Sequence, residues 1–277
     1  GNYNVTVGDE AGTALSTGDL NTFVGYSAGT AVTGTKNVAV GADAMLTSSS
    51  GDNNIAVGRE ALKRLTTSNE NIAVGSESLK ETTTGTQNVA MGHTAGQYAL
   101  TADNSVFIGH SAGKGITGTK LTGNSNTAVG TDAGLLLQGT AHSNVLLGAA
   151  AGDNITTGDS NIIIGTSINA ASATADNQLN IGGWITGAAG AITIPSTLTV
   201  NNAIAASTFA ASTSLNISRA QGSAGSPAAM ANGQQIGAVN FNGYTSSGGY
   251  RTGANIIATV TAGVSGDELP SSLLFGT

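Results

Sequence analysis

The pentapeptides GHSAG (109–113) and GYSAG (25–29) match the G-x-S-x-G pattern that carries the nucleophilic serine of α/β-hydrolases. In those enzymes the pattern turns a strand into a helix and exposes the serine hydroxyl. No amphipathic helix pattern follows Ser27 or Ser111. Equivalent pentapeptides elsewhere in the chain place other residues at the serine position: GDEAG (8–12), GHTAG (92–96), GTDAG (130–134) and GAAAG (148–152). We therefore expect no catalytic residue here and no enzyme activity.

Three carboxylates, Asp43, Glu60 and Glu77, occupy equivalent positions about 17 residues apart. If the chain stacks in coils, they lie about 5 Å from one another, which is close to the carboxylate separation of retaining glycosidases. That spacing is common to every stacked column, and Arg59 and Lys63 stand beside Glu60 to neutralise it. The sequence favours a solvated charged surface, with bound calcium as the main alternative. We assign no catalytic, cofactor-binding or metal-binding residue.

The histidines are His93, His110 and His142, and the first two occupy equivalent positions. Other residues at that position are as varied as on an exposed surface, so we expect no metal ion there. Threonines recur in turns, which raises the possibility of ice binding, but no T-x-T pair repeats on every coil. These threonines are Thr17, Thr33, Thr84 and Thr157.

An internal repeat of about 17 residues organises these positions. Each copy contains a short apolar run that ends in a glycine, called here the repeat glycine, and other positions are numbered relative to it. The eleven repeat glycines are Gly8, Gly25, Gly41, Gly58, Gly75, Gly92, Gly109, Gly130, Gly148, Gly165 and Gly182.

The repeat reads N-V-A-V-G, with asparagine at −4, aliphatic residues at −3 and −1, a mostly small residue at −2, and alanine at +3 in most copies. Its apolar period of two indicates a strand, and glycine at this density opposes a helix. So short a unit must stack on its neighbours, which predicts an all-β parallel β-roll, or β-solenoid, of about eleven coils. We expect the Val/Ile columns at −3 and −1 to form the dry core and the asparagines to bond amide to amide between coils.

Two departures from the period carry further expectations. The 21-residue spacing between Gly109 and Gly130, around KGITGTKLTG (114–123), indicates a longer loop that leaves the coil. The lone tryptophan, Trp184, follows the last repeat glycine and is interpreted as a cap on the open end of the roll.

Composition excludes several classes of protein. The chain has 277 residues, no cysteine, 9% charged residues and a net charge of −7. Disulfides and cysteine-based metal sites are ruled out, and the acidic balance disfavours nucleic acid as a partner. No apolar run approaches a membrane span and no signal peptide is visible, so we expect no membrane insertion.

The N-x-A-V-G-x-x-A repeats, over about residues 1–182, resemble the head repeats of YadA-like trimeric autotransporter adhesins and the repeats of bacteriophage tail fibres. The stretch ITIPSTLTVNNAIAASTF (192–209) resembles the thin neck of phage fibres. SPAAMANGQQIGAVNFNGY (226–244), GANIIATV (253–260) and GDELPSSLLF (266–275) resemble, in order, a fibre module found upstream of an intramolecular chaperone domain. Gly1 aligns with turn glycines, so we expect a fragment or processed product without that chaperone.

The resemblance implies a homotrimeric fibre. Its expected parts are a β-roll shaft (1–187), a neck or linker (188–216) and a β-rich module (217–277). We expect the alanine face at −2 and the alanine-rich neck (203–211) to be buried around the threefold axis.

The expected role is a structural part of a bacteriophage tail fibre, located extracellularly in the virion. Its partners would be a host-surface glycan or protein receptor and other tail proteins. The alternatives are a bacterial trimeric adhesin head, an ice-binding β-solenoid and a glycan-degrading tailspike.

Overall fold

The structure is a computed structural model that describes residues 1–47, 50–183, 185–188, 191–193, 221–223, 226–228, 235–245, 249–260 and 271–276. The described residues form β-strands and turns without any helix, so the predicted all-β class is confirmed. The chain divides into two compact units, Gly1–Thr199 and Val200–Thr277. The predicted neck (188–216) lies almost entirely outside the described residues, and its boundaries stay a prediction.

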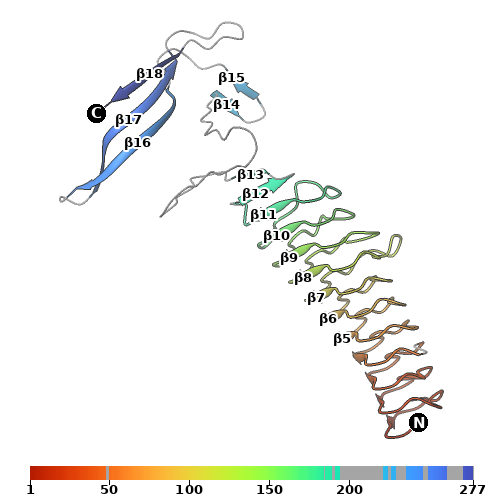
Figure 1. Cartoon of the computed structure of the whole chain (residues 1–277). Coiled ribbons are helices and arrows are strands. Elements are labelled where there is room, and N and C mark those ends of the chain that lie inside the picture. The colour runs from red at the N-terminus through yellow and green to blue at the C-terminus, as the bar shows by residue number, and fades with distance from the viewer. Residues whose placement is uncertain are drawn as a thin grey trace, which may run out of the picture. The chain divides into compact units, whose positions relative to one another are not determined.

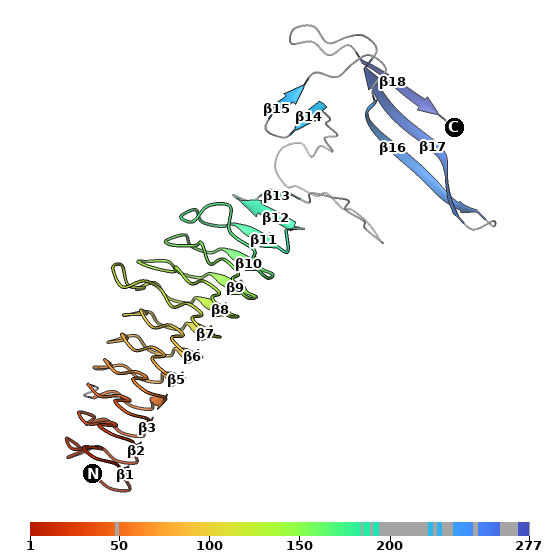
Figure 2. The same ribbon diagram turned by 180° about the vertical axis from the view of Figure 1, so that it is seen from behind.

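The first unit is the predicted parallel β-solenoid (Figure 1). Eleven three-residue strands stack in chain order, and each pairs in parallel with the next at the repeat spacing, as in Val38↔Ile55. They make about ten full turns. The turn segments line the side of the roll opposite the strands (Figure 2). The strands are β1 (Val5–Val7), β2 (Thr22–Val24), β3 (Val38–Val40), β4 (Ile55–Val57), β5 (Ile72–Val74), β6 (Val89–Met91), β7 (Val106–Ile108), β8 (Thr127–Val129), β9 (Val145–Leu147), β10 (Ile162–Ile164) and β11 (Leu179–Ile181).

The sheet changes direction at its C-terminal end. Strand β12 (Ile185–Ala188) pairs antiparallel with β11, and β13 (Ala191–Thr193) pairs antiparallel with β12. A reversed strand occupies the edge on which another parallel coil would otherwise pair. Trp184, the predicted cap, lies outside the described residues.

The repeat glycine is required by its backbone and by its neighbours. Gly109 has a φ of 132°, a conformation that L-residues rarely adopt. A Cβ on Gly109 would lie 2.5 Å from the carbonyl oxygen of Gly130 in the next coil. The coils therefore stack closely only because this column has no side chains.

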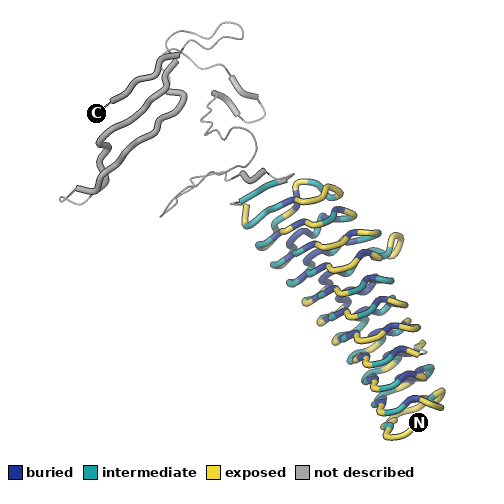
Figure 3. The backbone as a smooth tube through the Cα atoms, in the orientation of Figure 1, coloured by how far each residue is buried: buried dark blue, intermediate teal, exposed yellow. Residues whose placement is uncertain are grey.

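The core is built from different columns than predicted (Figure 3). The residues at −2 point inward and are fully buried in nine coils, whereas the Val and Ile residues at −3 and −1 are half-buried or exposed. The predicted core of Val and Ile residues and the predicted outward face of alanines are therefore wrong. The −2 residues form the core, and the −3 and −1 residues face outward. The inward −2 residues are Phe23, Ala39, Ala56, Ala73, Ala90, Phe107, Ala128, Leu146 and Ile163.

The physical reason is the narrow interior of a 17-residue coil. The alanines at +3, such as Ala61 and Ala112, are buried on the side of the coil that faces the strand. This side lies close to the strand, so there is little room for side chains between them. Larger residues at +7, such as Leu65 and Ile155, fill the widest part. A small −2 residue therefore marks the inside of the roll, and the bulkier β-branched residues lie outside.

In the coils of β2–β5 and β7, a large side chain at one of the positions −2 and +4 goes with a small one at the other. Where −2 is alanine in β3, β4 and β5, position +4 holds a buried Met45, Leu62 or Leu79. Where −2 is phenylalanine, position +4 is glycine, and the ring covers that glycine and the glycine of the preceding coil. Phe107 lies in this way against Gly96 and Gly113.

The asparagine column bonds between coils, as predicted. Asn71 Oδ1 accepts hydrogen bonds from the backbone N–H of Asn88 at 3.0 Å and from its Nδ2 at 3.1 Å. Asn71 Nδ2 donates to Asn54 Oδ1 at 3.2 Å and to the turn carbonyl of Gly85 at 2.9 Å. The buried amides thus satisfy both one another and the backbone of the turns, so that burying them carries little desolvation penalty.

A second polar column at −6 was not predicted. Asp52 Oδ1 accepts a hydrogen bond from the backbone N–H of Thr35 at 2.7 Å. The N–H of Asp52 donates to Asn69 Oδ1 at 2.8 Å in the next coil. Aspartate and asparagine at this position fix the turns to one another.

The predicted longer loop is confirmed between β7 and β8. Leu121 is buried and forms isolated parallel bridges with Ala99 and Gly139, so the stack continues beneath the insertion. Thr117, Gly118 and Thr119 are exposed at the loop tip.

The second unit contains two antiparallel sheets. Strands β14 (Gln221–Ser223) and β15 (Ser226–Ala228) form a hairpin. Strands β16 (Gln235–Thr245), β17 (Gly249–Val260) and β18 (Ser271–Gly276) form a three-stranded sheet in that order. The three segments that carry the resemblance to a fibre module overlap these strands.

Candidate functional site

An outer aliphatic face runs along the whole roll and is one candidate functional surface. It consists of the −3 and −1 residues of β1–β11, which project from one side of the parallel sheet. Exposed fractions are 36% at Ile55, 37% at Val74 and 42% at Ile162, high for aliphatic side chains. Contiguous apolar strips of this kind are typical of interaction surfaces.

The serine candidates lie in turns. Ser111 follows β7, has a φ of 55° and is 4% exposed, and the segment after it forms turns. Its Oγ lies 3.1 Å from Nδ1 of His110, and the same Nδ1 lies 3.9 Å from the carboxylate of Asp132. In a catalytic triad the serine and the aspartate contact different ring nitrogens. The structure thus brings Ser111, His110 and Asp132 together without that geometry.

Ser27 lies in the equivalent turn after β2. Its hydroxyl donates to Glu10 Oε2 at 3.0 Å, and its backbone N–H donates to the carbonyl of Asp9. No histidine contacts it among the described residues. This serine has the contacts of a coil-to-coil link.

The carboxylate column at +2 forms a network of ion pairs. Glu60 lies 3.1 Å from Arg59, 2.8 Å from Lys63 and 2.6 Å from Lys80. Lys63 also lies 3.5 Å from Asp43. The predicted neutralisation by Arg59 and Lys63 is confirmed, and Lys80 adds to it.

These contacts change the acidity of the carboxylates. Hydrogen bonds from Lys63 and Lys80 lower the pKa of Glu60 to about 2. For Glu77, burial works against ionisation, but hydrogen bonds from Arg59 and Lys80 outweigh it and lower the pKa. Both groups are therefore charged at neutral pH, and neither has the raised pKa of a general acid.

The network continues into the next coils. Glu81 pairs with Arg64 at 3.0 Å and with Lys120 at 2.7 Å, although Lys120 is 39 residues away in the chain. Burial opposes ionisation of Glu81, and the hydrogen bonds from Lys120 and Arg64 still lower its pKa. Lys120 thereby ties the base of the long loop to the charged surface.

His93 and His110 are exposed and stack with ring centroids 5.3 Å apart, as their shared position predicts. His142 lies apart from them and contacts Asp159 at 3.1 Å. Within the described residues, no group of three or more His, Asp or Glu side chains is arranged to hold a metal ion.

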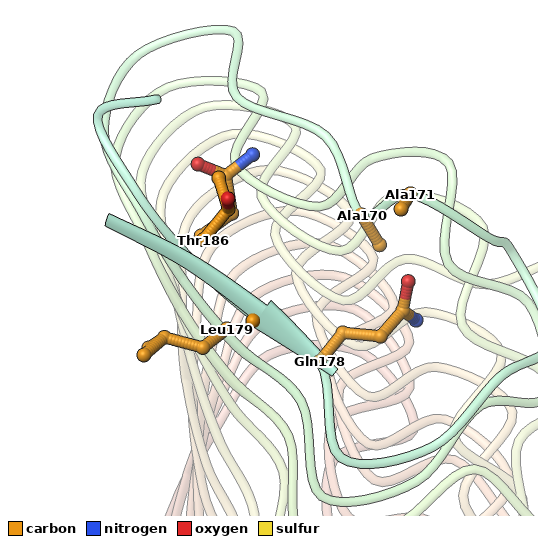
Figure 4. Close-up of a pocket in the computed structure, with 7 residues that line it drawn as sticks. Ala170, Ala171, Gln178, Leu179 and Thr186 are labelled. Carbon is orange, nitrogen blue, oxygen red and sulfur yellow. The ribbon is translucent and has the colours of Figure 1, made fainter. Parts of the chain in front are cut away.

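A pocket of about 250 Å³ opens at the C-terminal end of the roll (Figure 4). Gln178 and Leu179 line it beside Ala170 and Ala171 of the preceding coil. The Gln178 amide is already used, because its Oε1 accepts from Ser172 N–H at 2.8 Å and its Nε2 donates to the Ala175 carbonyl at 2.8 Å. The pocket therefore offers a ligand few free polar groups.

Comparisons of the chain with protein-family models, with curated proteins and with solved structures gave no match. Among the described residues, no helix has the length and apolar character needed to cross a membrane.

Proposed function

We propose that the chain is a structural fibre protein that attaches a virus to its host, as part of a bacteriophage tail fibre. The outer aliphatic face of the roll is the observation that carries this proposal. The face extends over all eleven coils. No described part of the chain covers its side chains. Three copies that pack these faces around a common axis would remove them from water.

The energetics favour such an assembly. Each square ångström of apolar surface buried contributes about 25 cal/mol, and the contribution of the face grows with every added coil. A fibre held in this way needs no disulfides, which suits a chain without cysteine. Three copies also display each weak receptor contact three times, which raises avidity.

The native mass by light scattering tests the assembly. One chain is 27.0 kDa, so a trimer is about 81 kDa. We expect the trimer for the native chain and a monomer when Val57 and Val74 are both replaced by lysine. The double variant Thr131→Lys with Ala149→Lys adds the same two charges at exposed positions off the face and should leave the trimer intact. A folded native monomer would refute the proposal.

The attachment role needs a separate test. Antibody raised against the chain should label tail fibres in electron micrographs of the virus that encodes it, and should block adsorption to the host. Labelling of a bacterial envelope would instead favour the trimeric adhesin head, the principal alternative. We propose that the protein is located in the virion, outside the cell. Its proposed partners are tail proteins and a host glycan or protein receptor.

Two further alternatives have direct assays. A flat aliphatic face left exposed on a monomer would favour ice binding, which a thermal-hysteresis measurement detects. Release of reducing ends from host polysaccharide would identify a glycan-degrading tailspike. The proposed fibre role involves no catalytic step, so we expect neither signal.

A further inference from the structure

The outer aliphatic face is bordered by two rims, which are the columns of residues at −5 and +1. These positions lie two residues beyond either end of each strand. Residues at −5 are exposed in all eleven coils, and those at +1 are exposed in all but one. Charged and polar side chains dominate both rims, as with Lys36 and Asn53 at −5 and Arg59 at +1. The rims thus separate the apolar face from the rest of the roll's surface.

The second coil is an exception, because both of its rim residues are large and apolar. Leu20 at −5 is 52% exposed, and Tyr26 at +1 is 55% exposed. Thr22 and Val24 of β2 lie between them on the face. In every other coil at least one of the two rim residues is polar. The apolar surface therefore reaches both rims at the level of this one coil.

We propose that Leu20 of one copy packs against Tyr26 of the next copy in the trimer. This inference rests on the proposed threefold assembly, which turns the outer face of each roll towards the axis. When the rolls run along such an axis, the −5 rim of one roll meets the +1 rim of its neighbour. Rotation about the axis does not change height, so residues of the same coil meet. This symmetry pairs Leu20 with Tyr26, and the contact occurs three times.

The chemistry of the two side chains fits such a contact. Within one chain they lie on opposite rims and stay in water, whereas between copies each covers part of the other. A tyrosine suits a rim, since its ring can be buried while its hydroxyl stays hydrated. In the other coils the short or charged rim side chains would keep their water, as in the polar border of most protein interfaces.

The charged residues of the rims do not oppose this register. Each of the four would face an uncharged residue of the same coil in the neighbouring copy. The pairs are Asp9 with Tyr3, Lys36 with Ala42, Arg59 with Asn53 and Glu70 with Ser76. The register therefore brings no like charges together along the rims.

A disulfide across the rims tests the contact directly, because the chain has no cysteine of its own. Leu20→Cys and Tyr26→Cys are introduced into the same chain. Under mild oxidation each copy should link to the next, which gives a covalent trimer on a denaturing gel without reductant and single chains with it. The strand between the two positions of one chain extends at about 3.3 Å per residue, so an internal link would exceed the roughly 7 Å that a disulfide allows between Cα atoms.

A second pair of cysteines controls for random collisions. Leu20→Cys with Thr166→Cys keeps the first cysteine and places the other at an exposed +1 position eight coils further along the roll. At about 4.8 Å per coil, the two positions differ in height by roughly 38 Å. This chain should therefore stay unlinked under the same conditions.

Loss of the contact should also weaken the assembly. Leu20→Ser should raise the concentration at which the trimer dissociates by about tenfold or more, measured by light scattering over a dilution series in mild urea. Tyr26→Ser should have a similar effect, and the double variant should add little to either, because the same contact is removed. Leu136→Ser replaces a 37% exposed leucine away from the rims and should leave the dissociation unchanged.

The outcomes separate this contact from the assembly itself. A native trimer whose Leu20→Cys, Tyr26→Cys chains stay unlinked would overturn the contact and leave the proposed trimer standing. Equal linking in the Thr166→Cys control would also overturn it, as would effects of Leu20→Ser and Tyr26→Ser that simply add. A native monomer would overturn both proposals.

Discussion

The exchange of core volume between positions −2 and +4 can be tested by giving one coil the pair of residue types found at these positions in another coil. The coil of Phe107 and Gly113 can be rebuilt as the coil of Ala73 and Leu79 by two substitutions, Phe107→Ala and Gly113→Leu. Leucine is compatible with the backbone at Gly113, because φ is 55° there and 47° at Leu79.

Each single substitution should destabilise the roll for a different reason. Phe107→Ala opens a cavity against Gly96 and Gly113, at a cost of about 3–5 kcal/mol of unfolding free energy. Gly113→Leu forces its Cβ into the ring of Phe107 and costs about 1–3 kcal/mol or more. In the double variant the leucine occupies the space of the ring. It should regain about 1.5–3 kcal/mol relative to Phe107→Ala, the value of burying one leucine side chain.

Urea unfolding followed by circular dichroism measures these differences. The protein concentration is kept fixed, because the proposed assembly would make stability depend on concentration. Gly139→Leu is the matched control for backbone strain, since Gly139 has a φ of 57° and its nearest neighbours are 3.6 Å from an added Cβ. It should cost less than Gly113→Leu. A double variant as unstable as the sum of its single variants would refute the exchange of volume.

Three further substitutions test individual polar side chains. With a folded pKa of about 2 against 4.5, Glu60 contributes about 3 kcal/mol above pH 4.5. This contribution is lost as pH falls from 4.5 towards 2, so urea midpoints should fall more steeply with acid in the native chain than in Glu60→Gln. Ser78→Ala should raise the melting temperature, because Ser78 Oγ is buried without a hydrogen-bond partner and its removal gains about 1 kcal/mol. Asn71→Ala should lower the unfolding free energy by at least about 2 kcal/mol, measured by urea unfolding, because it leaves the buried N–H of Asn88 without an acceptor.

The features predicted correctly are those that every coil imposes in the same way. The repeat glycine, the asparagine at −4 and the alanine at +3 recur because each contacts its own equivalent in the next coil, so one residue type satisfies the whole column. The Gly109–Gly130 spacing was also informative, since a stack of equal coils can place extra residues only in a loop. The pairing of Glu60 with Arg59 and Lys63 followed from their proximity in the chain.

The orientation of the strand could not be predicted by the same means. A three-residue run of alternating apolar residues has two faces, and side-chain size favoured the Val/Ile face as the core. The deciding information lies outside the strand, in residues such as Leu62 and Leu65 that occupy the interior from the opposite side of the coil. Once those side chains fill the core, only a methyl group fits at Ala56, and Ile55 and Val57 must point outward.

The columns that vary most carry information that a search for invariant positions misses. Position +4 is glycine in some coils and leucine or methionine in others, and position −2 ranges from alanine to leucine, isoleucine and phenylalanine, so each column taken alone resembles a tolerant surface site. Their volumes are complementary, however, because Phe107 fills the space of two glycines and Leu79 fills the space left by Ala73. The same logic applies to the charged columns, where Glu60 pairs with Lys80 of the neighbouring coil as well as with Lys63 of its own. In a stacked repeat, a departure from one column becomes interpretable through the residues that touch it in the neighbouring coil.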